Sequence, residues 1–123
     1  MIQPRTIVNI ADNSGAKIGR IFKVLGASRK RYAEIGETVI LSVQKAEPRK
    51  AIKKKDVLRA VVVRQTKPIR RKDGSYVRFD ENAVVILEKE KDEPIAGRIF
   101  GPIPREVGEA GFKTIASKAS EIV

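Results

Sequence analysis

The stretch that decides the fold runs from Val57 to Leu87 and reads VLRAVVVRQTKPIRRKDGSYVRFDENAVVIL. Each end holds a short, continuous apolar run, Ala60–Val63 and Val84–Leu87, in which β-branched residues predominate. Runs of this length favour strands buried on both faces, as in a small barrel, over helices. The sequence therefore predicts two core strands that are held apart by a long excursion.

The excursion is positively charged and ends in a tight turn. Lys67–Lys72 carries four cationic side chains and no carboxylate, and Asp73–Gly74 follows it directly. An Asp-Gly pair supplies the positive φ that a hairpin turn needs. A rigid barrel that presents a cationic arm is suited to gripping the phosphate backbone of a nucleic acid.

Three further strands are predicted before this centre. Thr6–Ile10 and Ile18–Leu25 form a hairpin across the turn Asp12–Gly15, and the second strand is expected to place Phe22 and Val24 on one face. The third strand is Thr38–Val43, whose alternation turns Val39, Leu41 and Val43 inward. With the two central strands this makes five, which is enough for a small barrel.

The chain after Leu87 is expected to be less regular. Ile99–Pro104 is apolar but broken by glycine and proline, so it predicts an ordered, irregular segment. Within it, Phe100 is either a lid on the core or an anchor at an interface, and the lid is favoured. Pro104–Val107 and Phe112–Ala119 predict two short helices, because proline suits a first helical turn and the apolar residues of the second segment recur at helical spacing.

Composition points to a polyanionic partner. The 123 residues, which the length prior assigns to a single domain, hold 26 Lys and Arg against 15 Asp and Glu, a net charge of +11. Residues 1–72 carry 19 basic and 5 acidic side chains, whereas residues 73–123 carry 7 and 10. The first part is therefore predicted to bind the polyanion, and the tail is better suited to protein contacts. No apolar run is long enough to span a membrane and no signal peptide is recognised, so no membrane partner is predicted.

Cysteine and histidine are both absent. Their absence removes disulfides, thiolate nucleophiles, the commonest general base and the usual zinc ligands. The pair Asp80–Glu81 is a poor candidate for paired catalysis, because neighbours on a strand point to opposite faces. The sequence therefore predicts no enzyme and no cofactor, and it fits the cytoplasm.

Three basic runs lie between the core strands, and a shared anionic partner explains them better than three independent solvated faces. Tyr32, beside the first run, either stacks on a base or packs against the barrel, and the packed position is favoured. The candidate RNA-binding residues are cations of these runs and of the neighbouring strands: Lys17, Arg20, Lys23, Arg29, Lys30, Arg31, Arg49, Lys50, Lys53, Lys54, Lys55, Arg64, Arg70, Arg71, Lys72 and Arg78.

Several motifs, in order, resemble one known family. They include Ala11–Ala16, Lys54–Val57, Ala60–Arg64, Arg70–Ser75, Arg78–Ala83 and Arg98–Pro102. The most specific pattern is an aliphatic triplet, nine residues, Asp-Gly, four residues, Phe, two residues, Asn, two residues and Val-Ile, and Val61–Ile86 fulfils all of it. Over almost its whole length the chain resembles the bacterial-type large ribosomal subunit protein fourteen family.

The resemblance implies a mainly β fold: a closed five-stranded β-barrel, here residues 1–88, with an extension of loops and two short helices, here residues 89–123. It implies a structural constituent of the large ribosomal subunit that binds large-subunit ribosomal RNA and contributes to intersubunit bridges with small-subunit RNA. Family members neighbour large-subunit proteins three and nineteen, and a ribosome-silencing factor docks on them. The residues assigned to the subunit interface or to protein contact are Arg98, Ile99, Phe100, Pro102, Arg105, Phe112 and Lys113.

The chain departs from the family pattern in a few places. Lys55 stands where the family has glycine, which adds charge but removes a residue that tolerates unusual backbone angles. Ala96–Gly97 replaces Gly-Thr, and the ending Phe112–Val123 diverges most. These last changes fall where the family meets protein partners.

The sequence supports two other functions less well than the ribosomal one. A freestanding single-strand-binding barrel would use aromatic platforms, but the chain has no Trp, two Tyr and four Phe, most of which are predicted to be in the core. An enzyme would have to rely on lysine or carboxylate chemistry alone.

Overall fold

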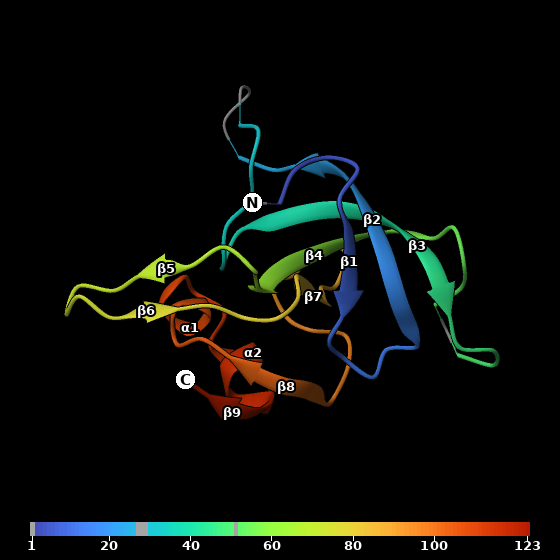
Figure 1. Ribbon diagram of the computed structural model, residues 1–123. Helices are drawn as coiled ribbons and strands as arrows, with labels where there is room; N and C mark the ends of the chain where they lie inside the picture. Colours follow the sequence, from blue (N-terminus) through green and yellow to red (C-terminus); the bar gives the residue numbers. More distant parts are fainter. Residues whose placement is uncertain (1, 27–29, 51) are drawn as a thin grey trace.

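The computed structural model describes residues 2–26, 30–50 and 52–123, and its centre is a closed five-stranded barrel (Figure 1). Neighbouring strands are antiparallel except where the first strand pairs in parallel with the last and closes the barrel. In order around the barrel, the strands are β1 (Ile7–Ile10), β2 (Ala16–Val24), β3 (Thr38–Ala46), β4 (Val57–Arg64) and β7 (Ala83–Ile86). The predicted closed barrel is confirmed.

The two apolar runs of the central stretch are buried on both faces, as predicted. Ala60, Val62, Val84 and Ile86 belong to the cluster that also holds the inward residues of β3. The alternate residues, including Val61 and Val85, belong to a second cluster beneath the C-terminal extension. Because successive residues of a strand point to opposite faces, two cores require a continuous apolar run rather than an alternating one.

The C-terminal extension packs on the outer face of β4 and β7. It consists of β8 (Ile99–Ile103), α1 (Glu106–Glu109), α2 (Lys113–Lys118) and β9 (Ala119–Ile122). Its contribution to the second cluster includes Ile99, Ile103, Val107, Phe112 and Ile115, all buried. The two predicted short helices are confirmed. Within the described ranges, neither helix is long and apolar enough to cross a membrane.

One element of the extension contradicts the prediction. Ile99–Pro104 was expected to be irregular, but most of it forms β8, which pairs in parallel with β9. Pro102 is tolerated because both strands of a two-stranded sheet are edges. Gly101 takes a φ of 78°, and the register shifts between Ile99 and Pro102. The glycine and the proline therefore bend this strand without abolishing it.

The cationic excursion forms a hairpin of its own, separate from the barrel sheet. Among the described residues, β5 (Ile69–Arg70) pairs only with β6 (Tyr76–Val77), and the two strands project outward from the barrel (Figure 1). Gly74 in the connecting turn has a φ of 89°, as the Asp-Gly pair predicts. The Asp73 carboxylate accepts hydrogen bonds from the backbone and hydroxyl of Ser75, and these bonds lower the pKa of Asp73.

The turn between β1 and β2 is fixed by a buried carboxyl group. Asp12 Oδ1 accepts hydrogen bonds from the Ser14 amide at 3.1 Å and from the Ser14 hydroxyl at 2.5 Å. Its Oδ2 accepts one from the Ile86 amide on β7 at 2.9 Å. Burial raises the pKa of Asp12, and the hydrogen bonds from Ser14 and Ile86 oppose that effect. Asp12 thus ties the predicted turn to the strand that closes the barrel.

The side-chain pattern predicted for β2 is wrong at one residue. Val24 is buried, but Phe22 is about half exposed. The pairing of β2 with β3 shifts register between Ile21 and Lys23, which indicates a bulge at that point. Because a bulge inserts one extra residue, it breaks the alternation on which the prediction relied.

Candidate nucleic-acid interface

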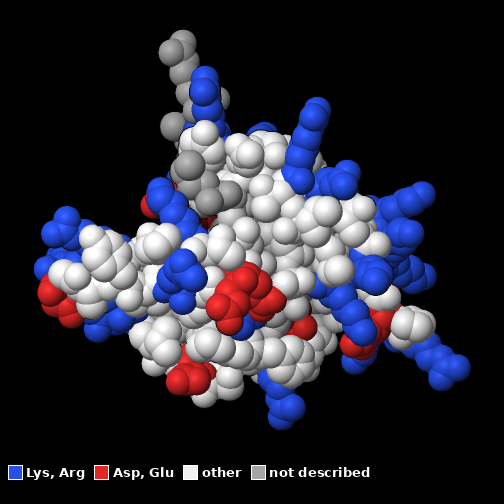
Figure 2. Space-filling view, viewed as in Figure 1, with Lys and Arg blue, Asp and Glu red and all other residues white. Residues whose placement is uncertain are grey.

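Cationic side chains gather where loops leave the barrel. Figure 2 shows Lys and Arg over the end of β3 and the loop that follows it, and again at the far end of the β5–β6 hairpin. Carboxylates form smaller groups, some beside these two cationic regions and others on the surface between them. The uneven charge of the sequence therefore becomes an uneven charge on this surface, with its cations on loops that a rigid barrel holds.

The loop between β3 and β4, residues 47–56, is the densest of these regions. It borders a hollow whose lining includes Lys45, Arg49, Lys50, Lys53 and Lys54, with Glu47 as its one carboxylate. Among the described residues, none of these five cations forms an ion pair. Like charges this close repel one another, so an anion in the hollow would stabilise the ordered loop.

The backbone of this loop is strained at two of its cations. Arg49 has a φ of 70° and Lys55 a φ of 75°, in the left-handed region that residues with a Cβ seldom adopt. The amide of Lys55 donates to the carbonyl of Val43, and the amide of Lys53 donates to the Asp56 carboxylate. Lys55, which stands where the resembled family has glycine, therefore occupies a conformation that suits glycine.

Exposed cations continue along β2. Lys17, Arg20 and Lys23 are all exposed, and Lys17 approaches Glu47 only at 4.0 Å. The exposed Phe22 lies between two of them in the sequence and adds an aromatic surface. Sequence reasoning missed Phe22 because the bulge is not visible in the residue pattern.

The first basic loop contributes less than the sequence indicated. Arg31 is exposed, but Lys30 forms an ion pair with Glu37, and Arg29 lies outside the described residues. Tyr32 is 40% exposed, so its side chain is partly covered, and its packing against the barrel stays a prediction. Part of its ring is accessible for stacking on a base.

The hairpin divides its cations into two kinds. Arg70, Lys72 and Arg78 are exposed and form no ion pair with another described residue. Arg71 is different, because its side chain is only 13% exposed and lies against α1. Sequence reasoning grouped Arg70 and Arg71 together, and the structure separates them.

Arg64 was predicted to bind RNA, but it is buried and does not present its charge to a phosphate in this conformation. The residue is 8% exposed at the end of β4. Its Nη1 donates to the Phe100 carbonyl at 3.2 Å, and its Nη2 lies 3.2 Å from Glu81 Oε1. Burial lowers the pKa of Arg64, an effect that the Glu81 carboxylate opposes. Arg64 therefore joins the barrel to β8, and Glu81 pairs with it there.

The residues assigned to protein contact also divide. Arg98, Phe100, Arg105 and Lys113 are exposed, and Pro102 is half-buried. Phe100 is 50% exposed, so the interpretation of its ring as a core lid is wrong. Ile99 and Phe112 cannot contact a partner in this conformation, because both are buried in the second core.

Aromatic side chains are more accessible than the sequence predicted. Besides Phe22 and Phe100, Tyr76 is strongly exposed on β6, and Phe79 is only partly buried. Phe112 alone among the four Phe is buried. Most Phe residues were expected in the core, and that expectation is wrong, because the bulge in β2 and the outward face of β8 turn two of them to solvent.

A family model described as Ribosomal protein L14p/L23e matches residues 1–123. The chain belongs to this family. The resemblance inferred from the sequence landmarks is confirmed. Membership makes the chain a structural protein of the large ribosomal subunit, associated with ribosomal RNA and other ribosomal proteins. The family is structural rather than catalytic, and RNA binding and translation are typical of it.

Proposed function

We propose that this chain binds large-subunit ribosomal RNA through cations that a rigid barrel holds on separate loops, and that it performs no catalysis. The observation that supports the proposal is the unpaired state, among the described residues, of the cations around the hollow beside β3. Neutralising phosphates with such cations releases counterions, which drives binding in a salt-dependent way. The proposed site of action is the cytoplasmic ribosome.

The exposed part of the extension is proposed to face other components of the ribosome. Arg98, Phe100, Pro102, Arg105 and Lys113 combine cations with apolar surface, a mixture that suits a protein contact or a bridge to small-subunit RNA. The partners proposed from the family are large-subunit proteins three and nineteen, together with a ribosome-silencing factor. The divergent ending lies in this same region, which makes the silencing factor the first partner to examine.

A pair of matched double variants tests the RNA proposal. Lys53→Gln/Lys54→Gln removes two exposed cations from the loop after β3, and Lys89→Gln/Lys91→Gln removes two from the acidic loop after β7. Binding to transcribed large-subunit ribosomal RNA is measured by filter retention over a range of salt concentrations. We expect the first variant to lower the salt slope by about 2 and the second to leave it unchanged. Equal slopes for the two variants would refute the assignment.

A single-strand-binding barrel is the second candidate, and the exposed aromatic residues are the observation that favours it. Stacking of bases on Phe22, Tyr32 or Tyr76 would be tolerant of sequence and would not require folded RNA. Competition decides between the two. Unstructured polyuridine should displace the ribosomal RNA poorly if the barrel grips a folded backbone, and efficiently if it is a single-strand binder.

A further inference from the structure

The β5–β6 hairpin has little to hold it in place by itself. Each strand has two residues, and the pairing consists of Ile69 with Val77 and Arg70 with Tyr76. An isolated two-stranded hairpin of this size is marginal in water. At its base the Phe79 amide donates to the Gln65 carbonyl. The distal half, which carries Arg70 and Lys72, needs another attachment if it is to point in one direction.

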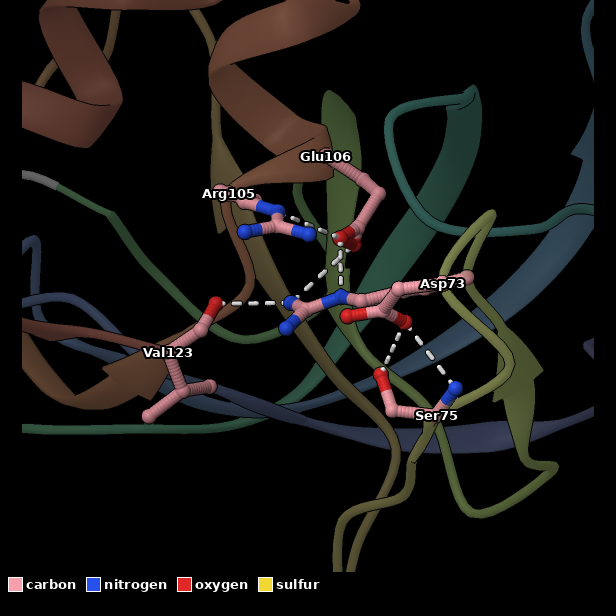
Figure 3. A network of polar contacts seen from close by, with 6 residues as sticks. Asp73, Ser75, Arg105, Glu106 and Val123 are labelled. Carbon is pink, nitrogen blue, oxygen red and sulfur yellow. Dashed lines mark hydrogen bonds and ion pairs between the residues drawn. The ribbon is translucent and has the colours of Figure 1, made fainter.

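Arg71 supplies that attachment, and Figure 3 labels two of its partners, Glu106 and Val123. Its Nε lies 2.9 Å from Glu106 Oε1 on α1, and its Nη2 lies 3.4 Å from Glu106 Oε2, which gives a fork-like pair. The same Nη2 donates to the main-chain oxygen of Val123 at 2.7 Å. Arg105 Nε lies 3.9 Å from the same oxygen, Glu106 Oε1. One guanidinium thus spans two separate parts of the extension.

Arg71 is also part of the turn that it holds. Its amide donates to the Ser75 carbonyl at 2.8 Å, and its carbonyl accepts from the Gly74 amide at 3.0 Å. The residue that closes the hairpin turn is therefore the one that fastens it to the extension. Its neighbours Arg70 and Lys72 remain exposed.

We propose that Arg71 is a positioning residue: together with Glu106 it holds the basic hairpin in one direction. The extension then contributes to RNA binding although Glu106 itself contacts no phosphate. This inference rests on the proposed RNA-binding function. When Arg71 is released, the hairpin samples other directions and only a fraction of molecules present Arg70 and Lys72 correctly. The apparent affinity for RNA then falls by that fraction.

Two roles for Arg71 predict opposite effects of a change in its partner. Glu106→Gln weakens the contact between Arg71 and the side chain at position 106. It also removes one negative charge, without altering any cation. If Arg71 were a phosphate ligand, this change would free it and strengthen RNA binding. If Arg71 positions the hairpin, the same change weakens binding. Glu109→Gln is the matched control, because Glu109 lies on the same helix, lines with Glu106 and Arg71 a hollow between α1 and the hairpin, and forms no ion pair with a described residue.

The experiment combines binding with a measurement on the free protein. Affinity for transcribed large-subunit ribosomal RNA is measured for the wild type and both variants, and backbone order parameters are measured by NMR for the Gly74 and Ser75 amides. We expect Glu106→Gln to bind about three- to tenfold more weakly than Glu109→Gln, and its hairpin order parameters to fall below about 0.6. Arg71→Gln should show the same loss of order, with unchanged amide shifts in the barrel strands.

The outcomes separate the two proposals. Binding by Glu106→Gln that equals or exceeds that of Glu109→Gln overturns the positioning role while the RNA-binding function stands. Unchanged order parameters at Gly74 and Ser75 in both Glu106→Gln and Arg71→Gln overturn the positioning role as well. A wild-type protein that does not bind the RNA overturns the proposed function, and with it the role of the Arg71–Glu106 pair in binding.

Discussion

Substitution of Gly101 by alanine tests how the extension is joined to the barrel. Gly101 has a φ of 78°, and a Cβ built on it would overlap the guanidinium of Arg64. That guanidinium is buried and donates to the Phe100 carbonyl. Gly101→Ala must therefore strain the backbone and also push Arg64 out of its place.

The two costs can be estimated separately. Left-handed backbone costs a residue with a Cβ about 1 to 2 kcal/mol. Displacing the buried charged donor costs about 1.5 to 3 kcal/mol more. The ion pair with Glu81 adds little, because 43% of the Glu81 side chain is exposed and water screens it. The total is about 2.5 to 5 kcal/mol, which lowers the melting temperature of a chain of this size by about 10 to 20 °C.

Gly74→Ala provides the comparison. Gly74 has a φ of 89°, and nothing lies within 4 Å of the Cβ position, so this variant suffers only the backbone strain. Urea unfolding followed by far-UV circular dichroism gives both free energies. We expect Gly101→Ala to be the less stable by about 2 kcal/mol, which is the contribution of Arg64. Equal destabilisation of the two variants would show that the Arg64 contact does not hold the extension.

Two further predictions concern the barrel loops. Lys55→Gly should raise the free energy of unfolding by about 0.5 to 1 kcal/mol, because Lys55 has a φ of 75°, whereas Lys54→Gly should lower it; the same urea titrations measure both, and a loss at Lys55 would contradict the assigned strain. Asp12→Asn tests the buried carboxyl group. Because burial holds the pKa of Asp12 above 3.8, the native state binds more protons than the unfolded chain between the two pKa values. The free energy of unfolding of the wild type should therefore fall relative to that of the variant as pH rises from below 3.8 through the native pKa. A pH dependence that is identical in both proteins would show that the pKa of Asp12 is not raised by folding.

Much of the barrel could be predicted because its signals are local. The apolar runs at Val61 and Val85 required strands buried on both sides, and Asp73–Gly74 required a tight turn. Each of these inferences depends on the properties of a residue and its immediate neighbours, which the sequence displays directly.

The roles of individual cations could not be predicted in this way. Arg70 and Arg71 are identical neighbours in the sequence, and contacts of Arg71 with Glu106, 35 residues away, and with Val123, 52 residues away, make them different. Arg64 is buried because β8 folds over it, which no local pattern indicates. Phe22 faces solvent because of a bulge. The candidate site was thus predicted as a distribution of charge, whereas the role of each side chain depended on long-range packing.

The sharing of β4 and β7 between two cores has a consequence for how the protein can change over evolutionary time. A substitution at Val62 or Ile86 alters the interior of the barrel, whereas one at Val61 or Val85 alters only the surface on which the extension packs. The two sets of positions can therefore drift independently, although they alternate along the same strands. Losing either strand, however, would dismantle both cores at once, so barrel and extension are expected to melt as one cooperative unit.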